Sequence, residues 1–289
     1  MNKICVLGSM NMDLVLKVKD MPKVGETILS KSFQKIAGGK GANQAVAAKR
    51  SGAEVFMISK IGKDENGREL RDKLVEDNID VKYVFEDRIE PTGMALIMVN
   101  DNGNNSIIVN AGSNMTLTKE EIHSAENLIK ESDIIISQFE TPEDITIEAF
   151  KIAKENGKVT ILNPAPAKKI KDQLLKYTDI IVPNETEAEL LTGIEIKDIE
   201  DAKKAGDIFL GKGVKFAIIT LGEKGAALIG KDFCEIVPAY RVNAIDTTAA
   251  GDSFIGGLSS KLDTKNLGRE TLSSSIRFGN KVSSIAVQR

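Results

Sequence analysis

The sequence predicts an α/β fold with a mainly parallel sheet that is covered by helices on both faces. After residue 118 the chain alternates between short apolar runs of strand length and longer runs with helical periodicity. This alternation is typical of parallel sheets. Segments 14–36 and 93–109 look like strands without helices between them, which predicts a small separate β-sheet. The 289 residues suffice for one large domain, so we expect a single unit over 1–289.

In the N-terminal half, the first expected strand is 3–8, an apolar run that ends in a glycine. An alanine-rich helix follows the glycine-rich segment 38–43 and ends at Gly52, since glycine terminates helices well. The other expected elements are strands at 14–19, 26–36, 55–59, 83–85, 93–99 and 106–109, a helix at 64–77 and a turn at 101–105. We expect the small sheet, with strands within 14–36 and 93–109, to act as a lid.

In the C-terminal half, strands and helices alternate regularly. The expected strands are 134–137, 159–162, 180–182, 216–221 and 226–229. The expected helices are 118–130, 143–156, 185–192, 198–211, 251–261 and 269–287. Strands linked through helices in this way pair in parallel and end at one common edge of the sheet.

The composition excludes several classes of function. With a net charge of −3, the chain offers no electrostatic support for nucleic-acid binding. No apolar run approaches the ~20 residues that a membrane span needs. His123 is the only histidine, which argues against a catalytic triad or a histidine-ligated metal. Cys5 and Cys234 lie in strand-like runs without metal-ligand spacing, so we expect free thiols in a cytoplasmic protein.

The segment 243–258 is the strongest candidate for chemistry. Ala249, Ala250 and Gly251 are small enough to let a ligand approach the backbone, and Asp252 then falls in the first turn of a helix. The free N–H groups and the positive dipole end of a helix start favour anions. The segment therefore predicts a phosphate site beside one carboxylate, although a capped loop–helix junction has the same pattern.

Polar residues follow several of the N-terminal strands. Asn11 and Asp13 follow the first strand, Asn43 lies in the glycine-rich segment, and Glu140 follows the strand at 134–137. If these side chains converge, they form a set that can bridge adjacent sugar hydroxyls. Taken singly, Asp13 is explained as a solvated loop carboxylate and Glu140 as a residue near a helix start.

Two further segments follow strands in the C-terminal half. Asn184 and Glu187 have the spacing of a capping box, and Glu187 is also placed to act on Mg²⁺ through water. The loop 220–225 offers a hydroxyl and a flexible backbone to a phosphate, although a hairpin turn explains it equally well.

Together these segments resemble the ribokinase (PfkB) family of carbohydrate kinases. Segments 38–43 and 246–252 are similar to the two signatures of the family, Asn184-x-x-Glu187 to its magnesium motif, and Thr220-x-Gly222 to its nucleotide loop. They occur in the family's order, and the resemblance runs from residue 3 to 287. It implies a ribokinase-like three-layer α/β/α fold with a β-sheet lid, and a homodimer formed through that lid.

The resemblance also implies ATP-dependent phosphorylation of the 5-hydroxyl of D-ribose. Asp252 would be the catalytic base, and the N–H groups near Ala250 and Gly251 would form an anion hole. The implied sugar-binding residues are Asn11, Asp13, Gly39, Lys40, Gly41, Asn43, Glu140 and Asp252. The implied ATP contacts are Asn184, Thr220, Gly222, Lys224, Gly225, Gly251 and Asn280.

Two metal ions are implied as well. Glu187 would organise Mg²⁺, and Asp246 and Thr248 would hold a monovalent cation, K⁺, with backbone carbonyls of Ala286 and Arg289. Relatives continue past the last helix into a loop that closes the cation site, so the resemblance leaves potassium dependence open.

Fructose or adenosine stays open as the acceptor, and so does a sugar-binding module without catalysis. The scarcity of aromatic residues weakens the nucleoside alternative.

Overall fold

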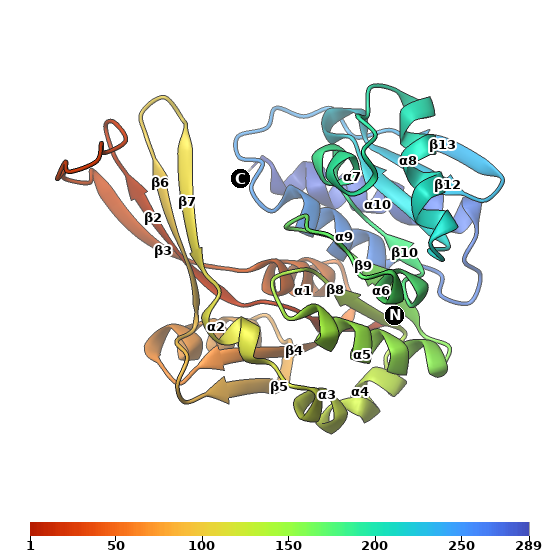
Figure 1. The fold of residues 1–289 in the computed structure, drawn as a ribbon, viewed down its shortest axis with the longest axis horizontal. Coiled ribbons are helices and arrows are strands. Elements are labelled where there is room, and N and C mark those ends of the chain that lie inside the picture. The colour runs from red at the N-terminus through yellow and green to blue at the C-terminus, as the bar shows by residue number, and fades with distance from the viewer. Residues whose placement is uncertain (289) are drawn as a thin grey trace.

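The computed structural model describes residues 1–288 and contains two sheets (Figure 1). The main sheet has nine strands in the order β13-β12-β11-β10-β9-β8-β1-β4-β5. Its strands are β1 (Lys3–Leu7), β4 (Glu54–Gly62), β5 (Asp80–Asp87), β8 (Ile134–Ser137), β9 (Val159–Leu162), β10 (Ile180–Ile181), β11 (Phe216–Thr220), β12 (Ala226–Gly230) and β13 (Phe233–Val237). Eight strands run in one direction and only β12 runs opposite to them, so the expected mainly parallel sheet is confirmed.

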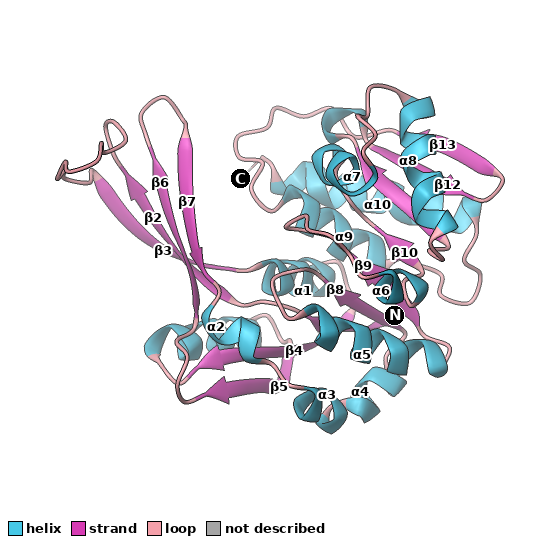
Figure 2. Cartoon of the chain, viewed as in Figure 1, coloured by secondary structure: helices cyan, strands magenta, loops and turns pink. Residues whose placement is uncertain are grey.

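Helices cover both faces of the main sheet, as the ribbon in Figure 2 shows. One face carries α1 (Lys40–Arg50), α2 (Glu65–Glu76), α9 (Ala250–Ser260) and α10 (Arg269–Ala286). The other carries α3 (Lys119–Ser124), α4 (Glu126–Glu131), α5 (Glu143–Glu155), α6 (Asp172–Lys176), α7 (Glu185–Thr192) and α8 (Ile199–Gly211). Two short 3₁₀ turns complete the fold, η1 (Gly112–Thr116) and η2 (Gly222–Lys224).

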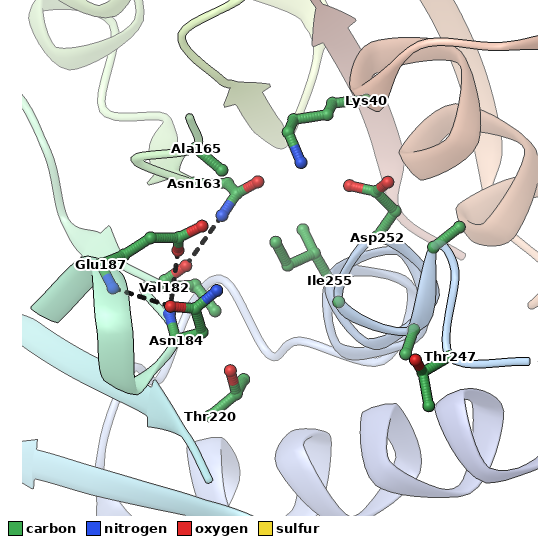
Figure 3. Close-up of a pocket in the computed structure, with 13 residues that line it drawn as sticks. Lys40, Asn163, Ala165, Val182, Asn184, Glu187, Thr220, Thr247, Asp252 and Ile255 are labelled. Carbon is green, nitrogen blue, oxygen red and sulfur yellow. Dashed lines mark hydrogen bonds between the residues drawn. The ribbon is translucent and has the colours of Figure 1, made fainter. Parts of the chain in front are cut away.

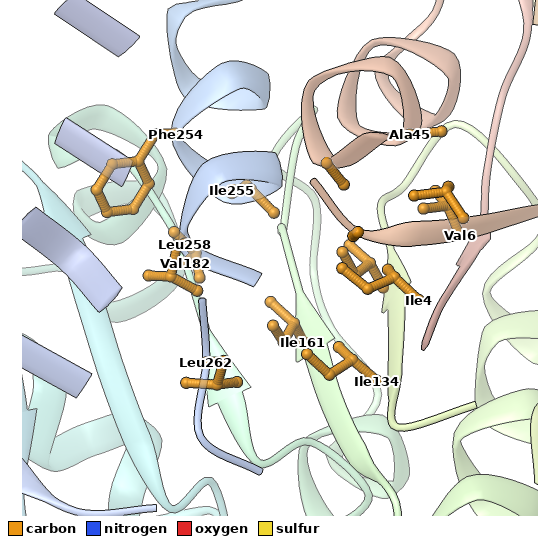
Figure 4. Close-up of a cluster of buried hydrophobic side chains, with 14 of the residues drawn as sticks. Ile4, Val6, Ala45, Ile134, Ile161, Val182, Phe254, Ile255, Leu258 and Leu262 are labelled. Atoms are coloured by element: carbon orange, nitrogen blue, oxygen red, sulfur yellow. The ribbon is translucent and has the colours of Figure 1, made fainter. Parts of the chain in front are cut away.

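The core follows the two-residue period of the strands. In β1, Ile4 and Val6 pack on the α1/α9 side, whereas Cys5 and Leu7 pack on the α5 side. All four are completely buried. Figure 4 shows the first of these clusters, in which Ile4 and Val6 lie under α1 and residues of α9 such as Leu258 meet the neighbouring strands. A sheet that is apolar on both faces requires helices on both faces, which gives the three expected layers.

The second sheet stands away from the main sheet (Figure 1). Its order is β3-β2-β6-β7, with β2 (Asn11–Lys17), β3 (Ser32–Gly38), β6 (Gly93–Val99) and β7 (Asn105–Asn110). Two antiparallel hairpins, β2–β3 and β6–β7, are joined by parallel pairing of β2 with β6. We call these four strands the lid sheet.

The expected strands of the lid sheet were wrong at several ends. The first strand begins at Asn11 rather than Leu14, because Asn11 pairs with both Gly38 and Gly93. The expected strand 26–36 loses its first half, since residues 26–31 lie outside any strand. Leu29 is 92% exposed, so burial of its side chain does not stabilise a strand there.

Other differences are local. The helix expected at 118–130 divides at Ala125 into α3 and α4, and the strand expected at 83–85 is the middle of the longer β5 in the main sheet. Strand β13 and helix α6 lie outside the expected elements. No helix within residues 1–288 is long and apolar enough to cross a membrane.

Close packing of α1 against β1 fixes the position of the site. The N-terminus of α1 lies against the backbone that leaves β1, and Ala42 N–H donates to the Ser9 carbonyl (3.0 Å). A Cβ atom on Gly41 would lie 2.6 Å from the carbonyl carbon of Gly8. Glycine at position 41 therefore lets the helix start approach the strand end, which is where ligand-binding groups gather in open α/β sheets.

Candidate active site

A pocket of about 170 Å³ opens at the carboxyl edge of the main sheet, beside the N-terminus of α9. Figure 3 shows Asp252 on one side of this pocket, Asn184 and Glu187 across from it, and the Lys40 ammonium pointing inward. The lining residues are Lys40, Asn163, Ala165, Val182, Asn184, Glu187, Thr220, Thr247, Ala249, Ala250, Gly251, Asp252 and Ile255. The pocket thus joins segments that are far apart in the sequence.

The start of α9 has a strained backbone. Ala249, the residue before the helix, has φ 56° and ψ 16°, a left-handed conformation that costs about 1–2 kcal/mol for a residue with a Cβ atom. The Ala250 N–H donates to the Thr247 carbonyl at 3.2 Å, whereas Gly251 and Asp252 belong to the first helical turn, where N–H groups have no intrahelical acceptor. Gly251 lines the pocket, so this helix start presents a donor to an anion.

Asp252 is only 7% exposed and is held by two amides. Its Oδ1 accepts from Gln44 Nε2 at 2.9 Å, and its Oδ2 accepts from Asn43 Nδ2 at 3.3 Å. Burial raises the pKa of Asp252, while the Lys40 charge and the two amides oppose the rise. A carboxylate with a raised pKa is a better proton acceptor than a solvated one.

Two more carboxylates face the same region from the lid side. Glu140 Oε2 accepts from Ser9 Oγ and from the Lys40 backbone N–H (3.1 Å). Burial, with a further contribution from the Glu140 charge, raises the pKa of Asp13 to about 6. Oxygen acceptors that burial has partly dehydrated suit the hydroxyls of a neutral polyol.

Asn114, which the sequence analysis missed, clamps the base of the lid sheet. Its side chain is buried, and Nδ2 donates to Asn11 Oδ1 (2.7 Å), Ala111 O (3.0 Å) and Met10 O (3.2 Å). Its Oδ1 accepts from Met10 N–H at 2.9 Å. One side chain therefore ties the entry of β2 to the exit of β7 and orients Asn11.

The expected magnesium motif forms the opposite wall. Asn184 Oδ1 accepts from Glu187 N–H (2.7 Å) and Glu187 Oε2 accepts from Asn184 N–H (2.9 Å), which is a complete capping box. Burial raises the pKa of Glu187. Thr220 pairs with Asn184 through an isolated β-bridge. All three residues line the pocket.

The remaining residues expected at the nucleotide lie outside the residues that line this pocket. Gly222 and Lys224 are exposed in η2. Gly225 has φ 105°, and a Cβ atom there would lie 2.1 Å from the Val237 carbonyl oxygen, so the fold itself requires glycine. Asn280 is buried, and its Nδ2 donates to the carbonyls of Val237 (3.1 Å) and Pro238 (3.0 Å).

The expected cation ligands form a turn behind α9. Asp246 Oδ1 accepts from Thr248 N–H at 2.8 Å, and bonds from Thr248 lower the pKa of Asp246. The Asp246 N–H donates to the Val287 carbonyl (3.2 Å), which brings the end of α10, including Ala286, toward this turn. Arg289 lies outside the described residues. Within residues 1–288, no three side chains of His, Cys, Asp or Glu gather as a metal cluster.

The sequence analysis also missed two buried amides near Asp252, those of Gln44 and Gln138. Gln44 follows Asn43 directly on α1, and Gln138 Nε2 donates to Gln44 Oε1 at 2.7 Å. A signal was present, because positions 40, 43 and 44 share one helix face. Gln138 gave no such signal, since it follows a continuous apolar run without periodic polar partners.

Comparisons with known proteins agree with this geometry. The model of the family described as "pfkB family carbohydrate kinase" matches residues 1–289. Ribokinase from Staphylococcus aureus is 44% identical over 100% of this chain and 94% of its own length. Deoxyribokinase from Salmonella typhi is 39% identical over 88% of this chain and 83% of its own. The structure of Arabidopsis thaliana ribokinase complexed with ribose and ATP superposes with a TM-score of 0.91 at 30% identity, covering 100% of this chain and 93% of that one. The chain therefore belongs to the pfkB family of carbohydrate kinases.

Proposed function

We propose that this protein transfers the γ-phosphoryl group of ATP to the 5-hydroxyl of D-ribose. The observation that carries the proposal is the position of Asp252, a buried carboxylate at a helix N-terminus between a polyol-type site and the Asn184–Glu187 wall. Ribokinases are among the relatives that match over the full chain, and one solved relative is described with ribose and ATP.

In the proposed reaction, Asn11, Asp13 and Glu140 bind the sugar hydroxyls and aim the 5-hydroxyl at Asp252. Asp252 Oδ2 accepts the hydroxyl proton while the oxygen attacks the γ-phosphorus, and ADP leaves on the opposite side. The Gly251 N–H and the dipole of α9 stabilise the charge on the transferring phosphoryl group. Lys40, whose ammonium points into the pocket, adds a positive charge beside the phosphates.

The residues present fit both metal ions, each of which would supply positive charge near the phosphates. Glu187 supplies one carboxylate beside the nucleotide wall, which suits Mg²⁺ because this ion keeps several waters and binds phosphates. When bound, Mg²⁺ would neutralise phosphate charge. Asp246 has a lowered pKa and an exposed carboxylate, so it suits a K⁺ ion held with Thr248 and the Ala286 carbonyl.

A coupled assay of ADP release tests the proposed function. The acceptors are ribose, 2-deoxyribose, fructose, adenosine and fructose 6-phosphate, each with and without K⁺. Ribose should give the highest kcat/KM. Failure of ribose while another acceptor works would replace the substrate and keep the family, whereas sugar binding without any ADP release would indicate a non-catalytic module. Loss of activity on chelation of Mg²⁺ is expected in every case.

Asn114→Ala should weaken sugar binding without touching the nucleotide. The change removes four hydrogen bonds that hold Asn11 and the base of the lid sheet. We expect the KM for ribose to rise about tenfold, because the hydrogen bonds that orient Asn11 contribute about 1.5 kcal/mol to sugar binding. The KM for ATP should stay within twofold. Asn102→Ala, in an exposed turn, is the matched control. An equal rise in both KM values would contradict a role confined to the sugar side.

We further propose that the lid sheet forms a homodimer. Its outer part exposes large apolar side chains: Phe33 (56%), Ile36 (47%), Ile107 (53%), Ile108 (62%) and Val109 (55%). Exposed apolar side chains on both faces of one sheet indicate interaction surfaces. Ile107 and Ile108 lie on opposite faces of the sheet, because β-strand residues alternate.

The double variant Ile107→Glu/Ile108→Glu should therefore halve the mass seen by sedimentation equilibrium. The control is Leu190→Glu, at an equally exposed leucine on α7 that lies outside the lid sheet. A wild-type protein that sediments as a monomer would overturn the dimer proposal.

The cytoplasm is the compartment that we propose for the enzyme. Cys5 and Cys234 are both free thiols, and ATP is a cytoplasmic substrate. Detection of the active enzyme in the soluble cytoplasmic fraction would support this location, and detection elsewhere would contradict it.

A further inference from the structure

A chain of buried side-chain amides runs behind Asp252. Gln138 Nε2 donates to Gln44 Oε1 (2.7 Å), and Gln44 Nε2 donates to both Asp252 Oδ1 (2.9 Å) and Asn163 Oδ1 (3.2 Å). Asn163 Nδ2 in turn donates to the backbone carbonyl of Val182 (3.0 Å). Gln44 is completely buried, Gln138 is 1% exposed and Asn163 is 7% exposed. The chain connects α1, the end of β8, the end of β9, the end of β10 and α9.

We propose that Gln44 is a positioning residue that orients the Asp252 carboxylate for proton transfer, and that Gln138 locks Gln44 in the required orientation. The inference rests on the proposed function, because it assumes that Asp252 is the base. Neither glutamine has a part in the sugar and nucleotide contacts proposed above.

The Val182 carbonyl fixes the orientation of every side-chain amide in this series of hydrogen bonds. The Val182 carbonyl can only accept, so Asn163 must turn its NH₂ group toward it and its oxygen toward Gln44. Gln44 then faces two acceptors, Asn163 Oδ1 and Asp252 Oδ1, and must present its NH₂ group to both. Its oxygen is left for Gln138, which donates to it. A reversed Gln44 would place three acceptor oxygens together.

The two oxygens of Asp252 are consequently different. Oδ1 accepts the shorter bond, 2.9 Å, from an amide that is itself held at both ends. Oδ2 accepts only the longer bond, 3.3 Å, from Asn43. The less strongly bound Oδ2 is therefore the oxygen available to a substrate hydroxyl.

One acceptor of Gln138 stays without a hydrogen bond in this arrangement, which costs stability. Its Oε1 is buried without a hydrogen-bond partner among residues 1–288. An unsatisfied buried acceptor destabilises a fold, so its retention needs a compensating role. Locking Gln44 supplies that role, because Gln138 Nε2 is the group that occupies Gln44 Oε1.

The charges around Asp252 determine how the loss of Gln44 would change the pKa of its carboxyl group. Lys40 lowers the pKa of this carboxyl and Glu140 raises it, while burial is the largest influence and raises it. The Gln44 and Asn43 amides oppose the effect of burial. Removing Gln44 leaves burial less compensated, so the pKa of Asp252 should rise further.

The test compares Gln44→Met and Gln138→Met with Gln173→Met, a control at an exposed glutamine of α6. We expect Gln44→Met to lower kcat about 10- to 100-fold, with both KM values within threefold, since the lost bond is made to a charge. The acidic limb of the kcat–pH profile at saturating ribose, where the effect of Asp13 on the KM does not enter, should move to higher pH. Gln138→Met should give a smaller loss of kcat and a shift in the same direction.

A double-mutant cycle adds a second criterion. If Gln138 acts through Gln44, the double variant Gln44→Met/Gln138→Met has the same kcat as Gln44→Met alone. Multiplicative losses would overturn the lock. A reduced amount of active enzyme with an unshifted acidic limb would show a purely structural role and overturn the proposal. If Gln44→Met does not fold, the acidic limb of Gln138→Met decides.

Asp252→Asn separates this inference from the proposed function. If Asp252→Asn keeps its activity, the assignment of the base fails. If Asp252→Asn is inactive while Gln44→Met keeps the wild-type pH profile, only the inference about Gln44 fails.

Discussion

Asp252→Asn should lower turnover about 10³- to 10⁴-fold, the range expected when a general base is removed. Asparagine has the shape of aspartate and keeps one oxygen that can accept from Gln44, so the pocket should retain its form. Binding of ribose and of ATP should therefore stay within a few-fold of the wild-type values. Single-turnover ADP release measures the first quantity, and isothermal titration calorimetry measures the second.

The matched control is Asp232→Asn, which changes an exposed aspartate in the turn between β12 and β13. Its turnover should equal that of the wild type. Near-wild-type turnover of Asp252→Asn itself would show that another group accepts the proton.

Asp13→Asn should raise the KM for ribose about 100-fold while leaving the KM for ATP unchanged. The substitution replaces a charged acceptor by a neutral amide in a site that burial has partly dehydrated, and hydrogen bonds to charged groups contribute about 1.5–3 kcal/mol. Initial rates at varied ribose and fixed saturating ATP measure this change. A similar rise in the KM for ATP would indicate a disturbed fold instead.

The pH dependence of the wild type follows from the same residue. Burial and the Glu140 charge raise the pKa of Asp13 to about 6, so its charged form is lost as pH falls through that value. The KM for ribose should rise about tenfold per pH unit below 6. In Asp13→Asn this limb should be absent.

Acid unfolding through Asp13 does not explain such a limb. The folded-state pKa lies above the ordinary value of 3.8, so the folded protein binds this proton more tightly than the unfolded chain. Asp13 therefore contributes more favourably to stability as pH falls from 6 toward 4. A melting temperature that holds over this range would separate loss of binding from loss of fold.

Most strands of the main sheet and most of its helices were predictable because each has one clear period. β8 and β9 lie where expected, at 134–137 and 159–162, since short runs rich in β-branched residues are typical of buried strands, and all eight residues are buried. The small sheet was less predictable, because the residues of β3 and β7 are largely exposed and most of those in β2 and β6 are only half-buried. Asn11 joins β2 through pairing with a residue of β6, and no local pattern shows such a partner.

For the site, glycines and carboxylates near strand ends were visible in the sequence, and Asp13, Glu140 and Asp252 do gather in the structure. Three neutral amides were not visible in this way. Gln44, Gln138 and Asn114 act through contacts between segments, and glutamine and asparagine occur on any surface. The left-handed backbone conformation of Ala249 was not predictable either, since an alanine in the sequence does not indicate a positive φ.

The parallel pairing of β2 with β6 governs when the lid sheet can be completed. The chain between these strands makes α1, β4, α2 and β5, so β2 and β3 are synthesised well before their partners. A two-stranded hairpin is marginal by itself, and closing a long loop slows the search for a distant strand. Three of the nine strands of the main sheet, β1, β4 and β5, therefore precede β6 in the chain, and the β2–β3 hairpin keeps an open edge until β6 pairs with it.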